Sequence, residues 1–259
     1  MPSPLANPMT IASIRSPLQI SWELLPDDYP LPDDPVDNID QPLLAEALRE
    51  SLDLAHQLPS QGFVATNFGI CTQVNDKFVI KAPDWVYIPR TESQRSRRRS
   101  YTPQREGDLP LIVMEFLSET EGGEYSVNPN YPYGKWYFYE RILQVPYYCI
   151  FEPERGRLEV YRLTDGRYQM VKADELERYR IAPLNLDLGV WQGDAKGTLR
   201  ARSQRNGYWL RWWDSEGHLL LWGAERIEQE RQNTEQERQR ADRLAEQLKA
   251  LGIDPETIL

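Results

Sequence analysis

The chain has 259 residues and a formal net charge of −10, and 40 % of its residues are hydrophobic and 11 % aromatic. This length and composition predict one globular body with a substantial core, together with a shorter appendage. The acidic balance argues against a general nucleic-acid binder, because Lys and Arg side chains must neutralise phosphates in such proteins.

Several other classes are also disfavoured. Cys71 and Cys149 are too few for a disulfide framework or a zinc site, and His56 and His218 are the only histidines, which argues against histidine-based catalysis. The apolar runs are too short to cross a bilayer, and the N-terminus lacks a basic segment followed by an apolar one. We therefore expect a cytoplasmic protein that makes no membrane contact.

The first part of the chain is rich in proline and aspartate. Residues 1–38 are poor material for regular structure, and we expect an extended lead-in with one edge strand at about Leu18 to Glu23. From Asp40, residues 43–56 place apolar side chains at helical spacing, with Asp40 as N-cap and Pro42 in the first turn. The acids of this helix are expected on its solvated face, unless one turns toward a metal site: Glu46, Glu50 and Asp53.

Short strands follow. Residues 63–66 and 77–80, separated by the turn-prone residues 74–76, predict a hairpin. The chain then enters the segment Lys81 to Pro89, in which Pro83-Asp84 opens a short alternating strand. Asp84 therefore lies at the beginning of a strand, where a carboxylate could reach a neighbouring strand end.

An arginine-rich segment comes next. Residues 90–105 hold six arginines and one acid, so this segment is about +5 and the rest of the chain about −15. One interpretation is a solvated loop. The other is an arm that follows the phosphates of DNA, through the side chains of Arg95, Arg97, Arg98 and Arg99.

The stretch Leu111 to Ser118 is an apolar run of strand length with Glu115 in its middle. Such a run predicts a strand covered on both faces. Burying an unpaired carboxylate costs roughly several kcal/mol. Either Glu115 pairs with a nearby Arg or Lys, or it shares a divalent cation with Asp84 on an adjacent strand. Magnesium favours one or two carboxylates plus water and phosphate oxygens.

The rest of the body, from residue 118 onward, is predicted to contain a long loop, a helix and several strands. Residues 118–132 predict a long loop, residues 134–143 a helix, and residues 147–151 and 158–162 two strands that a turn joins. Asp165-Gly166 signals another hairpin before residues 168–171. Residues 207–213 and 218–221 also suggest strand, turn and strand; the tryptophans there could stack bases, but packing in a half-buried strand is the commoner use.

From Ala224 the composition changes to Glu, Arg and Gln, without Gly or Pro before Gly252. On a seven-residue frame only the last two heptads of the seam are apolar. The tail is therefore either a marginal coiled coil that forms a homodimer through Ala241 to Leu251, or a single charged helix held by side-chain pairs. The predicted divisions are a lead-in at 1–38, a body at 39–223 and this tail at 224–259.

Several segments, in this order, resemble the Uma-two family of endonucleases within the restriction-endonuclease-like, PD-(D/E)xK superfamily. The resemblance spans roughly residues 60 to 222, and the end of the tail is similar to tails of bacterial members. Its parts are Pro83-Asp84, Met114 to Thr120, Lys135 with Tyr139, Val145 to Tyr148, Glu152-Pro153 and Leu158 to Tyr161. The resemblance implies an α/β fold, a mixed sheet flanked by helices, and Mg²⁺- or Mn²⁺-dependent hydrolysis of DNA phosphodiester bonds.

The resemblance also implies roles for individual residues. Asp84 and Glu115 match the two metal-binding acids, and the main-chain carbonyl of Phe116 would lie beside them. The superfamily places its lysine two residues after the second acid, where this chain has Leu117, whereas the family places it on the next helix, at Lys135. The other interpretation of Lys135 is a surface lysine at the start of an aromatic helix.

A second class of function remains open at this point. The loop before Lys135 contains prolines and Asn128 to Tyr131, and it differs from the shorter Arg/Asp-rich segment typical of the family. The chain could therefore be a catalytically inactive nuclease-fold protein that binds a protein partner through its coiled-coil tail. The acidic balance favours this alternative, and the two acids with a lysine favour the nuclease.

The arginine-rich segment generates a test of DNA binding. Replacing Arg97, Arg98 and Arg99 together with Ala should weaken DNA binding and flatten its salt dependence, because each lost phosphate contact removes roughly 0.9 from the log–log slope. Fluorescence anisotropy of labelled DNA, titrated at several salt concentrations, measures this slope. An unchanged slope would show that the segment is only solvated.

Overall fold

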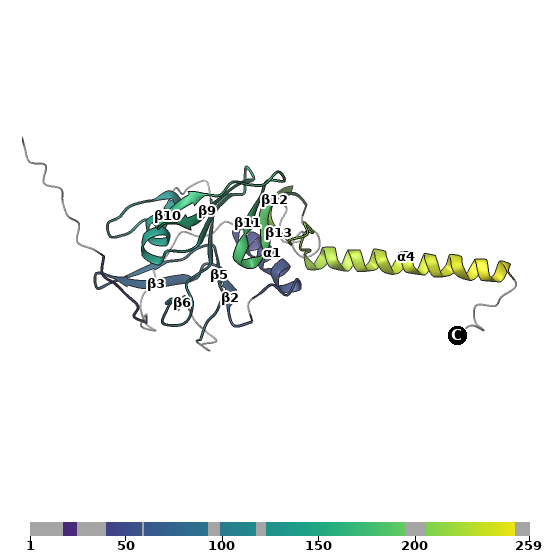
Figure 1. Cartoon of the computed structure of the whole chain (residues 1–259), viewed down its shortest axis with the longest axis horizontal. Coiled ribbons are helices and arrows are strands. Elements are labelled where there is room, and N and C mark those ends of the chain that lie inside the picture. Colours follow the sequence, from purple (N-terminus) through teal and green to yellow (C-terminus); the bar gives the residue numbers. More distant parts are fainter. Residues whose placement is uncertain are drawn as a thin grey trace, which may run out of the picture.

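The computed structural model describes residues 18–24, 40–58, 60–92, 99–117, 123–194 and 206–251. These residues form a mixed α/β body of three sheets with a long C-terminal helix (Figure 1). Most of the predicted lead-in and the segment 93–98 lie outside the described residues, and so do Arg95, Arg97 and Arg98.

The central sheet has six strands in the order β10-β9-β8-β7-β5-β2. Strands β7 and β8 are parallel and the other neighbours are antiparallel. All five residues of β7 are buried, as a continuous apolar run predicts. The strands are β2 (Phe63–Ala65), β5 (Trp85–Ile88), β7 (Ile112–Phe116), β8 (Tyr147–Glu152), β9 (Arg157–Thr164) and β10 (Arg167–Met170).

Two hydrophobic cores lie on the two faces of this sheet. Met114 and Phe116 of β7 pack with helix α1 (Gln41–Leu54) and with the sheet of β11, β12 and β13. Val113 points to the other face, into a second core. This core also contains side chains of the helical segment after residue 134 and of the sheet made by β1, β3, β4 and β6, which we call the first sheet. The further bounds are β11 (Arg178–Ile181), β12 (Leu186–Asp194), β13 (Asn206–Trp213), β1 (Ile20–Ser21), β3 (Gly69–Val74), β4 (Lys77–Lys81) and β6 (Ser100–Tyr101).

Helix α1 is confirmed, with Asp40 at its N-cap and proline in its first turn. Its apolar face is buried against the sheets, as the helical spacing of its apolar residues requires. Glu46 and Asp53 are exposed, and Glu50 is half-buried against Gly223.

The predicted first hairpin is wrong in its pairing. Strand β4 pairs with β3, a strand that the sequence analysis missed, and β2 pairs with β5 instead. The polar residues Thr72 and Gln73 within β3 broke the apolar pattern on which the prediction depended. The second strand predicted at 218–221 is present only in part: an isolated antiparallel bridge joins Trp213 and Leu219, with backbone hydrogen bonds from Asp214 N–H to the His218 carbonyl and from Leu220 N–H to the Trp212 carbonyl.

The helix predicted at 134–143 is present in a modified form. It consists of one α-helical turn, α2 (Lys135–Tyr137), that continues as a π-helix, η2 (Phe138–Leu143). Two short 3₁₀ turns, η1 (Gly123–Tyr125) and η3 (Ala182–Leu184), occur elsewhere. The tryptophans of β13 are buried in the core, which confirms packing as their use: Trp209, Trp212 and Trp213.

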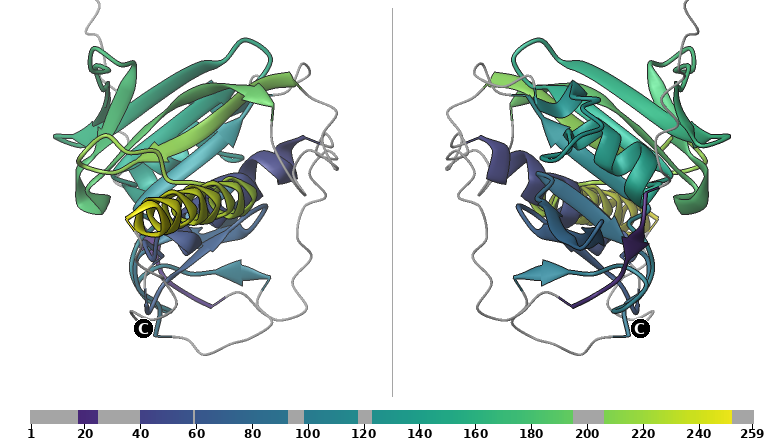
Figure 2. Two further views of the ribbon diagram at one scale, coloured as in Figure 1. Left: turned by 90° about the vertical axis from the view of Figure 1, so that its right-hand side faces the viewer. Right: turned by 90° about the vertical axis from the view of Figure 1, so that its left-hand side faces the viewer.

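The C-terminal helix α4 (Gly223–Ala250) runs away from the body (Figure 1), and Figure 2 shows it end-on. None of its residues is buried, and Ile227, Leu244 and Leu251 are exposed. The charged helix is therefore confirmed, whereas its pairing as a coiled coil stays a prediction. Within the described ranges, no helix combines the length and apolar character needed to span a membrane.

A buried arginine anchors the beginning of α4. Arg211 in β13 is fully buried, and its guanidinium donates to both carboxylate oxygens of Glu225, at 3.1 and 2.6 Å. It also lies 3.6 Å above the ring of Trp222 and donates to the carbonyl of Leu220. The indole of Trp222 donates to the carbonyl of Ala47 in α1, so the tail is joined to two elements of the body.

This anchor generates a prediction about stability. Glu225→Gln should lower the free energy of unfolding by about 3 kcal/mol, because it leaves the buried charge of Arg211 without its counter-ion. Urea denaturation measures the change. The control is Glu228→Gln, which removes an exposed partner of Arg231 and should cost less than about 0.5 kcal/mol. Equal effects of the two substitutions would contradict the role of the anchor.

Candidate active site

The pairing of β5 with β7 brings the two predicted acids together. Trp85 pairs with Met114 in antiparallel register, so the next pair along the ladder is Asp84 and Glu115. Residues directly opposite each other in such a pair project from the same face of the sheet. The carboxylate of Asp84 also accepts a hydrogen bond from the main-chain N–H of Phe116, at 2.5 Å. Asp84, which directly precedes β5, thus lies beside Glu115 of the neighbouring strand β7, close to the arrangement that the sequence analysis expects.

Glu115 has two hydrogen-bond donors from the helical segment above it. Its Oε2 lies 3.1 Å from Nζ of Lys135, and its Oε1 accepts a hydrogen bond from the hydroxyl of Tyr139, at 3.2 Å. The side chain of Glu115 is fully buried, whereas that of Lys135 is 22 % exposed. Lys135 is therefore a member of this site rather than a separate surface lysine, and Glu115 has a cation partner as well as a neighbouring acid.

The electrostatics of the pair follow from burial and from close charges. Burial raises the pKa of Glu115 to about 8, although Lys135 opposes the shift. Burial also lowers the pKa of Lys135, but the carboxylates of Glu115 and Asp84 outweigh this effect and raise it above its usual value. Lys135 keeps its charge 3.1 Å from Oε2 of Glu115, and the two side chains form an ion pair. Shifts of this kind gather at functional sites.

Two residues of the site were missed by the sequence analysis. The carboxylate of Glu124, in η1, has an oxygen 3.7 Å from Nζ of Lys135. The amide of Gln41, the first residue of α1, donates to the carbonyl of Phe116, at 2.8 Å. Glu124 lies in a segment interpreted only as a loop, and Gln41 is separated from Phe116 by 75 residues, so neither had a local signal.

The donor atoms of the site fit a divalent cation. The carboxylates of Asp84 and Glu115 and the carbonyl of Phe116 are hard oxygen donors, which Mg²⁺ and Mn²⁺ prefer. The Phe116 carbonyl keeps a lone pair when Gln41 occupies the other. Among the described residues, no cluster of three or more His, Cys, Asp or Glu side chains is arranged to hold a metal ion. A cation at this site would therefore need water or substrate oxygens to complete its coordination.

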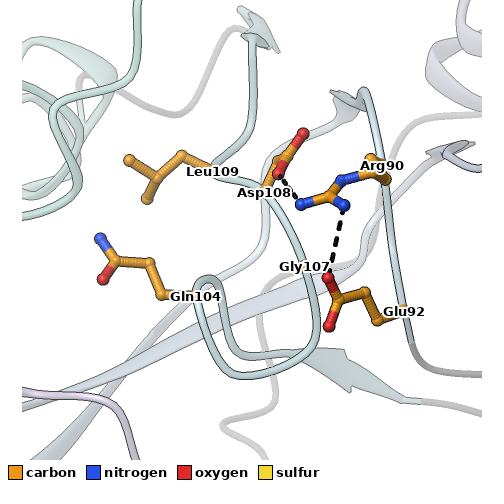
Figure 3. A pocket seen from close by; sticks show the side chains of 6 residues that line it. All are labelled: Arg90, Glu92, Gln104, Gly107, Asp108 and Leu109. Carbon is orange, nitrogen blue, oxygen red and sulfur yellow. Dashed lines mark hydrogen bonds and ion pairs between the residues drawn. The ribbon is translucent and has the colours of Figure 1, made fainter.

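The arginine segment is only partly described. Arg99 is exposed and precedes β6, at the edge of the first sheet. Arg90 follows β5 at the end opposite Asp84, and its guanidinium lies 3.4 Å from both Glu92 and Asp108 (Figure 3). Arg90, Glu92 and Asp108 line a surface pocket together with Gln104, Gly107 and Leu109. Because the length of β5 separates this pocket from Asp84, it is not part of the candidate site.

The fold and the site together define a class. A mixed α/β sheet that carries two acids on adjacent strands, with a lysine from the following helix, is consistent with the restriction-endonuclease-like fold. A model of the Uma2 (Uma-two) family, described as "Putative restriction endonuclease", matches residues 28–195. The chain belongs to the Uma2 family, and the matched range contains Asp84, Glu115 and Lys135. No curated protein matches the chain. The family assignment indicates a nuclease.

Proposed function

We propose that this protein is a metal-dependent endonuclease that hydrolyses the phosphodiester bonds of DNA. The observation that carries the proposal is the fully buried Glu115, which lies opposite Asp84 and within 3.1 Å of Lys135. Such a cluster costs stability when it has no ligand, because buried charges are desolvated. Binding of a divalent cation beside Lys135 would explain why the central strand β7 carries the acid Glu115.

The protein's own residues would divide the work as follows. Asp84, Glu115 and the carbonyl of Phe116 would hold Mg²⁺ or Mn²⁺. The cation would polarise a phosphate oxygen and lower the pKa of the attacking water. The ammonium of Lys135 would orient that water or stabilise the charge that develops on the phosphate. Tyr139 and Gln41 fix the orientation of Glu115 and of the Phe116 carbonyl through their hydrogen bonds.

DNA is the proposed partner, as the family assignment suggests. The net charge of −10 opposes DNA binding, so local positive charge must supply the contacts to phosphates. The proposed source is the arginine segment, with Arg99 exposed at the edge of the first sheet.

A second proposed contact is the pairing of two copies of the chain through residues 241–251. The exposed side chains of Leu244 and Leu251 support this pairing. Analytical ultracentrifugation measures whether the protein is a monomer or a dimer.

The first test is cleavage itself. Purified protein should cleave plasmid or single-stranded DNA with Mg²⁺ or Mn²⁺, and EDTA should abolish cleavage. Asp84→Asn and Glu115→Gln should each lower the rate by about two orders of magnitude or more, because each removes a ligand of the cation. The matched control is Asp108→Asn, which alters an acid of the separate pocket near Arg90 and should leave the rate unchanged. Absence of cleavage on every DNA form would favour the interaction module that acts through the tail.

The second test concerns the lysine. Lys135→Ala should lower the cleavage rate by about two orders of magnitude, as for the loss of one electrostatic contributor, and leave metal affinity nearly intact. Single-turnover cleavage and calorimetric titration with Mn²⁺ measure the two effects separately. Lys172→Ala, at an exposed lysine of another surface, is the control. Cleavage by Lys135→Ala at the wild-type rate would remove this lysine from the mechanism.

A further inference from the structure

Glu124 is a buried acid that the proposed mechanism does not yet use. Its side chain is 3 % exposed, and its Oε1 lies 3.7 Å from Nζ of Lys135. Its Oε2 is buried and has no hydrogen-bond partner within the described part of the chain. The backbone at this residue is held by the hydroxyl of Tyr148, which donates to the Glu124 carbonyl at 2.9 Å. A fixed, buried and half-satisfied carboxylate therefore faces the lysine of the site.

Lys135 lies between two acids that it does not contact equally. Its ammonium is closer to Glu115, at 3.1 Å, than to Glu124, at 3.7 Å. An ammonium has three donors and can exchange one acceptor for another by a small rotation of its side chain. Oε2 of Glu115 cannot serve a divalent cation and the ammonium equally well, because both would compete for the same oxygen and would repel each other at short range.

Charge balance points to the same arrangement. Asp84, Glu115 and Glu124, when ionised, carry a charge of −3, and Lys135 reduces the total to −2. One divalent cation neutralises this charge, whereas without Glu124 the site would become positive when the cation binds. Because buried charge must be compensated, the third acid matches the site to a cation of charge +2.

We propose that Glu124 is the second acceptor of Lys135: when a divalent cation binds Asp84 and Glu115, the ammonium leaves Glu115 and forms its main ion pair with Glu124. Glu124 is then a positioning residue, which acts on the cation only through Lys135. This inference rests on the proposed metal-dependent function. A direct role of Glu124 as a ligand is not what the geometry indicates, since the described acids form no three-membered metal cluster.

A double-mutant cycle in the full chain tests this proposal, with Mn²⁺ binding measured by isothermal titration calorimetry. Glu124→Gln should weaken Mn²⁺ binding by about tenfold, within the range for residues that support metal ligands, because Lys135 then stays on Glu115 and competes with the cation. Lys135→Met removes the competitor, so it should bind Mn²⁺ no more weakly than the wild type. In the Lys135→Met background, Glu124→Gln should have no further effect.

Controls separate this role from a structural one. Glu140→Gln alters another buried acid, which lies in η2, pairs with Arg167 and does not contact the site, and it should leave Mn²⁺ affinity unchanged. Thermal unfolding checks that each variant is folded. Glu124→Asp keeps the charge and should restore most of the affinity that Glu124→Gln loses.

Each other outcome overturns a specific statement. An equal loss of affinity on Glu124→Gln with and without Lys135 would make Glu124 a direct ligand, and no loss in either background would make it structural. Either result would reject the proposal that Lys135 moves from Glu115 to Glu124, and would leave the proposed nuclease function intact. If the wild type binds no Mn²⁺, or if Asp84→Asn does not weaken binding, the proposed metal-dependent function fails and the inference fails with it.

Discussion

The ion pair between Glu115 and Lys135 is the interaction on which the arrangement of the site depends. Placing a carboxyl group inside the central strand requires a cation from elsewhere in the chain, because an unpaired buried charge is costly. The lysine arrives from a helical segment twenty residues later, which must return over the end of β7. That segment continues as a π-helix, a conformation that is frequent at functional sites, and its second residue, Tyr139, supplies the other hydrogen bond to Glu115.

The fold was predictable where one periodicity dominates a segment. Strand β7 is a continuous apolar run, α1 has apolar residues at helical spacing, and α4 has no Gly or Pro after its first residue, Gly223, so all three were predicted. Strand β12 was missed because Gly189 and Gly193 within it suggest breaks. The structure explains one of them: a Cβ atom at Gly193 would lie 2.4 Å from the ring of Trp191. This glycine serves the packing of a large side chain, which a local pattern does not reveal.

The site was predictable where its residues lie in segments whose order along the chain matches that of the Uma2 family. Asp84, Glu115 and Lys135 follow such an order, and strand register then brings the two acids together. Glu124 and Gln41 depend on long-range geometry: the path of a loop in one case and the end of a helix in the other. Neither residue type is unusual in its segment, so sequence alone could not distinguish these side chains from solvated ones.

Helix α1 connects the site with the base of the tail. At its first residue, Gln41 donates to the Phe116 carbonyl, and one to two turns later the Ala47 carbonyl accepts a hydrogen bond from Trp222. Trp222 in turn lies against the buried guanidinium of Arg211, which holds Glu225 of α4. A helix is stiff over this length, so fixing it near the tail also limits its movement at the Phe116 carbonyl. The buried arginine therefore supports two features at once, the direction in which α4 leaves the body and the position of one oxygen proposed to face the cation.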